Sequence, residues 1–138
     1  MSRKILIIDD EEAIREVTQV TLEVLSGWTT VMVRSGKEGV TMAAADPPDA
    51  ILLDVMMPEM DGPHTLKELQ LNPVTRNIPV IFLTAKVQSA EVRRLQTLGA
   101  KAVIAKPFDP MNLADEVAQA VGWEKNGSKE EDKLCCGS

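Results

Sequence analysis

Aromatic residues are scarce in this chain of 138 residues, which has two Phe, two Trp and no Tyr. So few rings disfavour the aromatic platforms on which proteins stack single-stranded nucleic acid or sugars. Positive charge is also in the minority, because 15 Lys and Arg face 21 Asp and Glu, for a formal net charge of −6. This balance works against non-specific binding to nucleic acid or to an anionic membrane. It suits a site that gathers carboxylates around a cation.

Long apolar runs and a cysteine framework are missing as well. No apolar stretch approaches the ~20 residues that a membrane span needs, and the one at the N-terminus is too short for a signal peptide. We therefore expect a cytoplasmic protein. The only cysteines, Cys135 and Cys136, are adjacent near the C-terminal end, with no His beside them. They cannot staple a core or complete a metal site, and Gly137 breaks the pattern of a prenylation box.

Apolar runs and helical patterns alternate along the first 122 residues. The patterns predict strands at 4–9, 28–33, 50–53, 78–83 and 101–105, and helices at about 12–25, 35–45, 63–71, 89–98 and 110–121. Five such βα units with short connections predict an α/β domain with a parallel sheet covered by helices on both faces. We expect one domain over residues 1–122, followed by a polar segment at 123–138 whose composition predicts disorder.

Helical spacing also predicts the apolar faces of the first and last helices. The apolar face of the first helix comprises Ala13, Val17, Val20 or Thr21, and Val24. The expected buried stripe of the last helix comprises Met111, Leu113, Val117 and Val121.

Polar side chains stand where the predicted strands end. Asp9 and Asp10 follow the first strand, Asp54 the third, Thr84 the fourth and Lys106 the fifth. Because the carboxyl ends of parallel strands meet at one edge of a sheet, we expect these side chains to converge. Three carboxylates in one crevice repel one another unless a cation joins them. Oxygen ligands without His or Cys favour Mg²⁺.

This set of groups suits a phosphoryl group. Asp54 would open a surface loop and act as a nucleophile that forms an aspartyl-phosphate. The metal and Lys106 would neutralise the charge on the transferring oxygens, and Thr84 would donate a hydrogen bond to one of them. A capping Asp, a strand-end Thr or a surface Lys each has an ordinary structural explanation when taken alone. Their occurrence together at four strand ends favours the functional interpretation.

Four stretches carry a resemblance to a known family: ILIIDDEEAIR, DAILLDVMMPEMDG, PVIFLTA and AVIAKPF. Together they resemble the receiver domain of two-component response regulators, over about residues 3–122. The resemblance implies a flavodoxin-like, doubly wound sheet with strand order 2-1-3-4-5.

The resemblance also implies a role for each strand-end residue. Asp54 would be the phosphoacceptor, Thr84 the switch hydroxyl and Lys106 the phosphate counter-ion, with a cis peptide bond before Pro107. The implied Mg²⁺ ligands are the carboxylates of Asp9, Asp10 and Asp54 and the backbone carbonyl of Met56.

Three positions bear on how such a switch would work here. Many family members have an aromatic residue three positions before the lysine, whose rotation reports phosphorylation, but this chain has Val103. A movement of Thr84 toward the phosphate cannot be transmitted through Val103 in the same way. Lys86 and the side chain of Met56 flank the entrance to the site, at positions that the family uses to tune removal of the phosphoryl group.

The expected function is that of a stand-alone receiver. It would take a phosphoryl group from a phosphohistidine of a sensor histidine kinase or histidine phosphotransfer protein, and the conformational change would control a downstream protein target. We expect no direct contact with nucleic acid or membrane, and a homodimer is left open. The chain would assist its own phosphorylation and dephosphorylation rather than act as an enzyme on other substrates.

Two other interpretations come from different classes of protein. A phosphatase that forms an aspartyl-phosphate usually needs a second acid two residues after the nucleophile, where this chain has Met56. A pseudo-receiver that serves only as an interaction module would normally have lost part of the acid pair, the phosphoacceptor or the lysine, and this chain keeps them all.

Other polar residues have simpler interpretations. His64, the only histidine, follows Gly62 and Pro63 at a helix start, and we expect it to be an exposed residue rather than a phosphodonor. The basic residues Arg93, Arg94 and Lys101 are expected to form a solvated face, with docking of a partner as the alternative.

Overall fold

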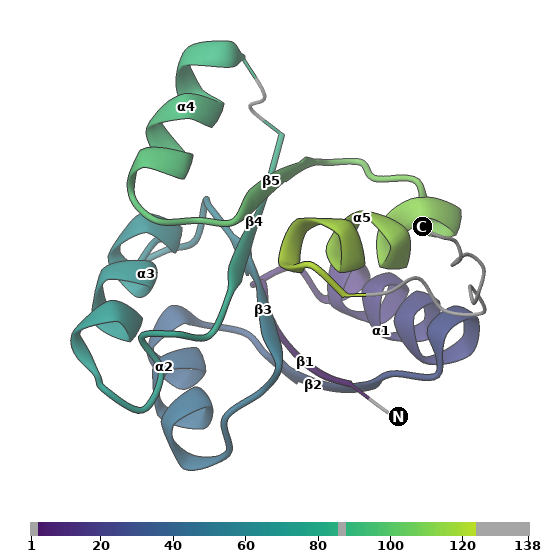
Figure 1. The fold of residues 1–138 in the computed structure, drawn as a ribbon, viewed down its shortest axis with the longest axis horizontal. Helices are drawn as coiled ribbons and strands as arrows, with labels where there is room; N and C mark the ends of the chain where they lie inside the picture. Colours follow the sequence, from purple (N-terminus) through teal and green to yellow (C-terminus); the bar gives the residue numbers. More distant parts are fainter. Residues whose placement is uncertain (1–2, 86–87, 124–138) are drawn as a thin grey trace, which may run out of the picture.

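The computed structural model describes residues 3–85 and 88–123, in which five strands alternate with five helices (Figure 1). The strands are β1 (Lys4–Ile8), β2 (Thr29–Val33), β3 (Ala50–Asp54), β4 (Val80–Thr84) and β5 (Ala102–Ala105). The helices are α1 (Glu12–Ser26), α2 (Gly36–Ala45), α3 (Gly62–Leu71), α4 (Ser89–Thr97) and α5 (Pro110–Val121). The expectations for Lys86, for the cysteines and for the polar segment after Trp123 lie outside the described residues.

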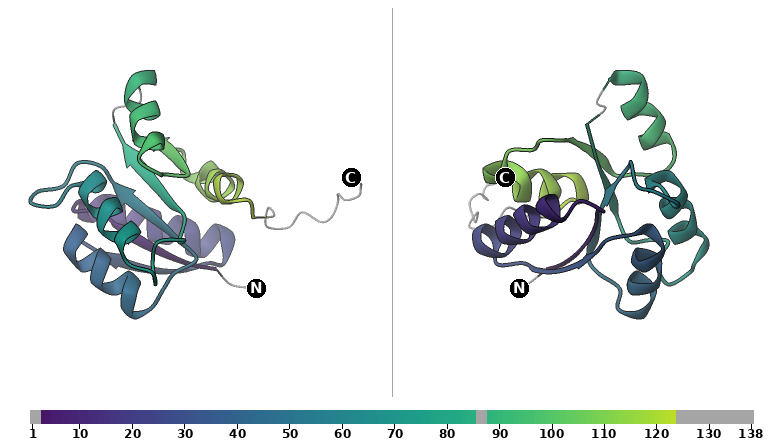
Figure 2. Two further views of the ribbon diagram at one scale, coloured as in Figure 1. Left: turned by 60° about the vertical axis from the view of Figure 1, so that its left-hand side comes forward. Right: turned by 180° about the vertical axis from the view of Figure 1, so that it is seen from behind.

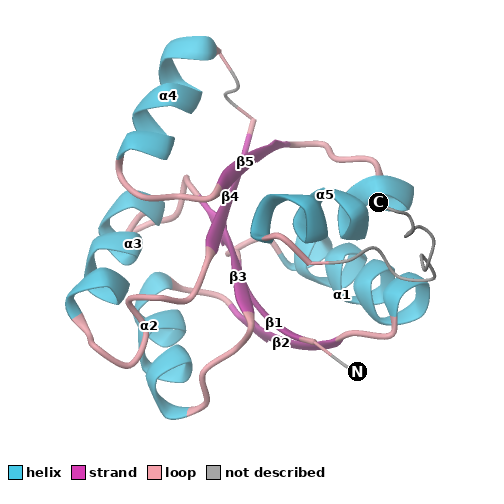
Figure 3. Cartoon of the chain, viewed as in Figure 1, coloured by secondary structure: helices cyan, strands magenta, loops and turns pink. Residues whose placement is uncertain are grey.

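All neighbouring strands are parallel, and their order is β2-β1-β3-β4-β5. The predicted doubly wound α/β fold and its strand order are therefore confirmed. Helices α1 and α5 cover one face of the sheet, and α2, α3 and α4 lie on the other (Figures 2 and 3).

The core has two layers because side chains alternate along each strand. On the side of α1 and α5, Ile7 and Leu52 pack with Leu113 of α5. On the other side, Ile8 and Leu53 pack with residues of α2 and α3. This alternation also decides the side of the sheet on which each strand-end side chain lies.

The fourth strand begins later than predicted. Strand β4 starts at Val80, because Pro79 has no N–H and the N–H of Ile78 is bonded to the carbonyl of Thr75 in the preceding turn. The carbonyl of Pro79 still accepts a hydrogen bond from the N–H of Ile51 on β3.

Most of the apolar face predicted for α1 is exposed. The side chains of Val17, Val20 and Val24 are 45%, 58% and 74% exposed, and Ala13 is exposed as well. Of the two predicted alternatives, Val20 and Thr21, only Thr21 is buried, and it lies on a buried stripe with Thr18 and Leu22. Hydropathy alone does not show that Thr18 is buried. Its hydroxyl can be buried because it donates a hydrogen bond to the carbonyl of Ile14 at 2.7 Å.

The predicted stripe of α5 is correct except at its first residue. Leu113 and Val117 are fully buried, and Val121 is half-buried. Met111 is exposed instead, and its N–H is bonded to the capping carboxylate of Asp109.

No helix among residues 3–85 and 88–123 combines the length and the apolar character needed to cross a membrane.

Candidate functional site

Three of the predicted site residues lie on the same side of the sheet. Ile8, Leu53 and Ala105 precede Asp9, Asp54 and Lys106, so the alternation that turns Ile8 and Leu53 toward α2 and α3 turns the two carboxylates toward α1 and α5. Asp9 is fully buried, and Asp54 is only 4% exposed. Two acidic groups at the end of a buried sheet need partners nearby, because an unpaired buried charge is costly.

Lys106 supplies that partner. Its Nζ lies 3.1 Å from Oδ2 of Asp9, 3.2 Å from Oδ1 of Asp54 and 3.3 Å from Oε1 of Glu11. The peptide bond between Lys106 and Pro107 is cis, as the family resemblance implied. The N–H of Lys106 also donates to the carbonyl of Thr84, so the loop after β5 is tied to the end of β4.

Backbone contacts fix the loop between β1 and α1. The N–H of Glu11 donates to Oδ1 of Asp9 at 2.9 Å, and the guanidinium of Arg15 donates to the carbonyl oxygen of Asp9 at 2.7 Å. The first bond holds the buried carboxylate of Asp9 and the second holds its backbone, while Asp10 stays exposed. Arg15 and Glu11 were not recognised as site residues from the sequence, because nothing in their spacing shows that they turn back toward Asp9 and Lys106.

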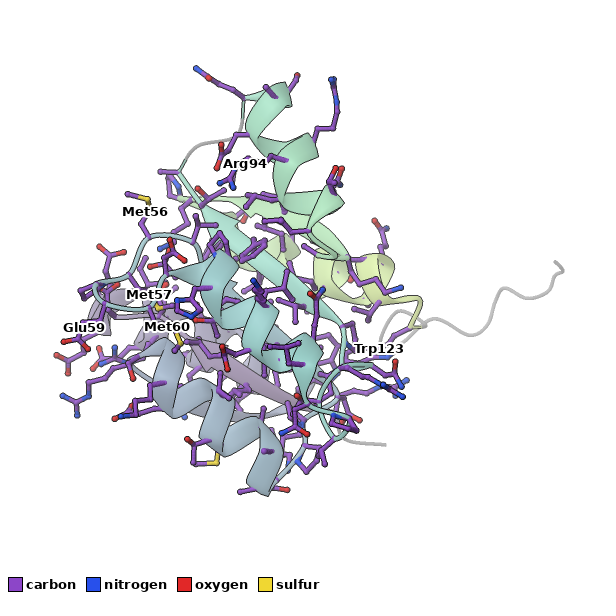
Figure 4. All side chains as sticks on the ribbon, turned by 90° about the vertical axis from the view of Figure 1, so that its left-hand side faces the viewer. Met56, Met57, Glu59, Met60, Arg94 and Trp123 are labelled. Atoms are coloured by element: carbon purple, nitrogen blue, oxygen red, sulfur yellow. The ribbon has the colours of Figure 1, made fainter. Side chains whose placement is uncertain are left out.

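The loop between β3 and α3 approaches Asp54 closely at Gly62. A Cβ at this position would lie 2.6 Å from the carbonyl oxygen of Asp54 and 2.8 Å from Cα of Val55. Glycine is therefore required there for packing, and its N–H donates to the carbonyl of Val55 at 2.9 Å. Glu59, in the same loop, has a positive φ of 67°. Figure 4 shows Met56 at the outer edge of the domain, and its side chain is 61% exposed.

The electrostatics of the site follow from burial and charge. Burial and the nearby carboxylate of Asp9 raise the pKa of Asp54 to about 6, against the opposing influence of Lys106. Burial alone would lower the pKa of Lys106, but the carboxylates of Asp9 and Asp54 outweigh it and raise that pKa above its ordinary value. The site thus contains an acid that holds its proton to a higher pH than an ordinary Asp and an ammonium group that stays charged at neutral pH.

The carboxylates also fit a divalent cation. Carboxylate oxygens of Asp9, Asp10 and Asp54 all lie within 4.8 Å of one another. A donor set made only of oxygen atoms matches the preference of Mg²⁺. This grouping confirms that the predicted metal-binding side chains come together, and the ligand role of the Met56 carbonyl stays a prediction.

An open cleft of about 450 Å³ gives access to these groups. It is lined by Asp10, Glu11, Ile14, Asp54, Met56, Ala85, Lys106 and Pro107. A larger hollow of about 660 Å³ lies between α3 and α4, but Glu68 is the only acid among its described lining residues. The smaller cleft is therefore the candidate site.

Thr84 does not line the cleft. Leu83 belongs to the core layer beside α1 and α5, so the alternation along β4 places Thr84 on the opposite side, where Val103 packs. Thr84 is buried, with 1% of its surface exposed. Its predicted contact with a phosphoryl group would therefore require a change in its side chain or in the strand end.

The remaining polar residues agree with their simpler interpretations. The side chain of His64 is 53% exposed and lies 3.8 Å from Glu68. Arg93 and Lys101 are exposed, and the exposed Arg94 pairs with Glu91 at 2.9 Å.

The model of the response regulator receiver domain matches residues 5–118. Among curated relatives, the alkaline phosphatase synthesis transcriptional regulatory protein PhoP of Bacillus subtilis is 37% identical over 113 residues, which are 82% of this chain and 46% of PhoP. The response regulator SaeR of Staphylococcus aureus is 38% identical over 109 residues, which are 79% of this chain and 46% of SaeR. The chain thus spans about half the length of these relatives.

Solved structures agree with the sequence relatives. The chemotaxis response regulator CheY4 of Vibrio cholerae superposes with a TM-score of 0.82 at 26% identity, covering 87% of this chain and 99% of CheY4. The receiver domain of the sensor histidine kinase PA1611 of Pseudomonas aeruginosa superposes with a TM-score of 0.79 at 27% identity, covering 88% and 99% of the two chains, and its structure has a magnesium ion coordinated in the active-site cleft. Such domains are signalling switches of two-component systems, and this chain belongs to the response regulator receiver domain family.

Proposed function

We propose that Asp54 accepts a phosphoryl group from a phosphohistidine and that the modified domain controls a partner protein. The observation that carries this proposal is the position of Lys106, whose Nζ lies 3.2 Å from Oδ1 of Asp54 beside the other acids of the cleft. A cation at that point faces the place where a phosphoryl oxygen on Asp54 would carry negative charge. Membership of the receiver family supports the same role.

The transfer is a direct displacement at phosphorus. An ionised carboxylate oxygen of Asp54 forms the new P–O bond while the P–N bond to the donor imidazole breaks, and the imidazole nitrogen keeps the electron pair of that bond. Lys106 orients the acceptor oxygen and neutralises one oxygen of the transferring group. Asp9, Asp10, Asp54 and the carbonyl of Met56 would hold Mg²⁺, which would supply further positive charge to the phosphoryl oxygens when bound.

The response is proposed to pass through Thr84. Its hydroxyl is the donor group at the end of β4, and its movement toward a phosphoryl oxygen would change the packing on the α4 side of β5. Val103 lies on that side of β5, opposite Phe82 of β4. Because valine has no ring to rotate, we expect phosphorylation to shift β4 and α4 rather than to rotate an aromatic side chain.

The exposed valines of α1 offer a surface for the phosphodonor. Helix α1 begins beside the acceptor cleft, and Val17, Val20 and Val24 form an apolar stripe along its outer side. An apolar stripe on one helix fits the groove of a helical bundle, and a phosphohistidine normally stands on such a bundle. This contact would bring the histidine to Asp54.

We also propose the donor, the location and the output of this switch. The donor is a sensor histidine kinase or a histidine phosphotransfer protein, the location is the cytoplasm, and the output is carried by a protein contact. PhoP is named a transcriptional regulatory protein, but this chain covers only 46% of it. The acidic net charge of −6 argues against nucleic-acid contacts by the receiver domain itself.

Phosphoimidazole tests the proposal, because it presents the same P–N bond as phosphohistidine. With Mg²⁺, the chain should gain one phosphoryl group that hydroxylamine removes, as expected for an acyl phosphate. Asp54→Asn should gain none, and Asp46→Asn, which changes an exposed acid paired with Lys4, should react like the unchanged chain. An unchanged chain that takes up no phosphoryl group would contradict the proposal and favour the interaction module without phosphorylation.

A further inference from the structure

Three carboxylates surround the ammonium group of Lys106. An ammonium has three N–H donors, and the three acceptors within 3.3 Å are Asp9, Asp54 and Glu11. Phosphorylation neutralises the carboxylate of Asp54, and any further bond from Lys106 to a phosphoryl oxygen requires the release of Asp9 or Glu11. The site therefore contains a competition for the lysine that must be resolved at each phosphorylation.

The three acceptors differ in how easily they can leave. Asp9 is fully buried, and its carboxylate is held by the N–H of Glu11. Asp54 is the residue proposed to receive the phosphoryl group. The side chain of Glu11 is 62% exposed, and its contact with Lys106 is the longest of the three. A released Glu11 carboxylate would enter water, whereas a released Asp9 carboxylate would stay buried without its counter-ion.

Helix capping does not account for the orientation of Glu11. It occupies the N-cap position of α1, but its side chain accepts no capping hydrogen bond from the helix. A Ser, Thr, Asp or Asn at that position would usually cap the helix. The carboxylate of Glu11 is directed to Lys106 instead, so its removal would cost the helix no capping hydrogen bond.

We propose that Glu11 is a positioning residue that holds Lys106 before phosphorylation and is exchanged for a phosphoryl oxygen during it. This inference rests on the proposed phosphorylation of Asp54. While Glu11 is in place, its negative charge lies at the mouth of the cleft and opposes the approach of strongly anionic donors. Glu11 thereby sets the preference of the receiver among phosphodonors of different charge.

Two small donors separate charge from reactivity. With acetyl phosphate, Asp54 forms a P–O bond while the bond from phosphorus to the acetyl oxygen breaks, and acetate leaves with the electron pair. With phosphoramidate, the P–N bond breaks and the protonated nitrogen leaves as ammonia. Acetyl phosphate is more anionic than phosphoramidate near neutral pH, so phosphoryl transfer to the same acceptor meets Glu11 with two different donor charges.

The experiment measures the rate constant of phosphorylation with each donor at saturating Mg²⁺ and low ionic strength. For Glu11→Gln, which keeps a hydrogen-bond acceptor but loses the charge, the rate constant with acetyl phosphate should rise by about threefold or more. The ratio of the rate constants for acetyl phosphate and phosphoramidate should rise by about twofold, and a high salt concentration should reduce that change. Glu12→Gln is the control, because Glu12 is the next residue and is exposed, whereas the ion pair with Lys106 is made by Glu11.

The outcomes separate the two claims. Equal donor ratios in the unchanged chain and in Glu11→Gln, with both chains phosphorylated, would overturn the role of Glu11 and leave the phosphorylation of Asp54 intact. An equal change in Glu12→Gln would also overturn it, since general charge rather than the Lys106 contact would then be responsible. An unchanged chain that reacts with neither donor would overturn the proposed function and this inference with it.

Discussion

The ammonium nitrogen of Lys106 lies 3.2 Å from Oδ1 of Asp54, although the two residues are 52 positions apart in the sequence. The parallel sheet makes this contact possible, because the carboxyl ends of β3 and β5 lie at the same edge. The contact balances charge in the resting domain and prepares the site for a further negative group. Under the proposed function, stability and phosphorylation would therefore depend on the same lysine.

Replacement of Lys106 by Met should destabilise the fold in the absence of Mg²⁺. The buried carboxylates of Asp9 and Asp54 would lose their counter-ion, and the free energy of unfolding should fall by about 2–4 kcal/mol. Saturating Mg²⁺ should restore part of this loss, because the ion binds the folded acids and neutralises them. Urea denaturation with and without Mg²⁺ measures both effects.

Lys101→Met is the matched control for this prediction. Lys101 is exposed, so its replacement should change the unfolding free energy by less than about 0.5 kcal/mol. Equal stabilities of Lys106→Met and Lys101→Met without Mg²⁺ would contradict the proposed charge balance.

Asp54→Asn should stabilise the metal-free domain more at neutral pH than in acid. The pKa of Asp54 rises from 3.8 to about 6 on folding, mainly through burial, so the folded state binds the proton more tightly than the unfolded state. The stability linked to this group is present below pH 3.8 and is lost as the pH rises through about 6. Asn does not titrate and does not incur this loss.

The stability advantage of Asp54→Asn should therefore grow by about 2 kcal/mol between about pH 4.5 and pH 7.5. Chemical denaturation of both chains in chelator at these two pH values measures the difference. An advantage that stays constant, or that shrinks as the pH rises, would show that Asp54 is not held with a raised pKa.

Gly62→Ala should disturb the acceptor loop more than an alanine at another glycine. Its Cβ would meet the carbonyl oxygen of Asp54 and Cα of Val55, which are backbone atoms of the same strand end. We expect a loss of about 2–4 kcal/mol in unfolding free energy, together with slower phosphorylation.

Gly27→Ala provides the comparison for Gly62→Ala. Gly27 has a φ of 73°, but the methyl carbon of an alanine there would meet no atom within 4 Å, so only the left-handed backbone opposes the substitution. The expected loss is about 1 kcal/mol, with no change in phosphorylation rate. Phosphorylation that slows equally in both variants would contradict a specific contact between Gly62 and the acceptor.

Val20→Lys should separate folding from recognition of the donor. Val20 is 58% exposed, so the substitution should change stability by less than about 0.5 kcal/mol. Transfer from the phosphohistidine of a helical donor should slow about tenfold, because a charge would enter the apolar contact. Phosphorylation by acetyl phosphate, which needs no docking surface, should not change.

Leu71→Lys is the control for the docking surface. Leu71 is 69% exposed at the C-terminal end of α3, away from the edge of the sheet where Asp54 lies. If both lysine substitutions slow transfer from the helical donor equally, the stripe on α1 is not the docking surface.

The sequence predicted the architecture because each strand is a short apolar run that ends at a polar residue. The convergence of Asp9, Asp54 and Lys106 followed from parallel strands alone, and the structure places both carboxylates within 3.2 Å of the lysine nitrogen. Residues that act through backbone contacts were missed, notably Arg15 and Gly62. Their partners are carbonyl oxygens, which carry no signal in the residue pattern.

The exposed face of α1 was not predictable from hydropathy. Valines form the more apolar stripe, but the helix buries Thr18 and Thr21, whose hydroxyl-bearing side chains count as polar in a pattern. Likewise, Thr84 lies on the side of β4 opposite to Leu83. Its position at the end of the strand does not by itself show which side of the sheet its side chain faces.

The most direct test of the central claim is the intact mass of the chain after incubation with acetyl phosphate, with and without Mg²⁺. We expect a Mg²⁺-dependent gain of one phosphoryl group in the unchanged chain and no gain in Asp54→Asn. A phosphoryl group that still appears on Asp54→Asn, or an unchanged chain that gains none with Mg²⁺ present, would contradict the assignment of Asp54 as the phosphoacceptor.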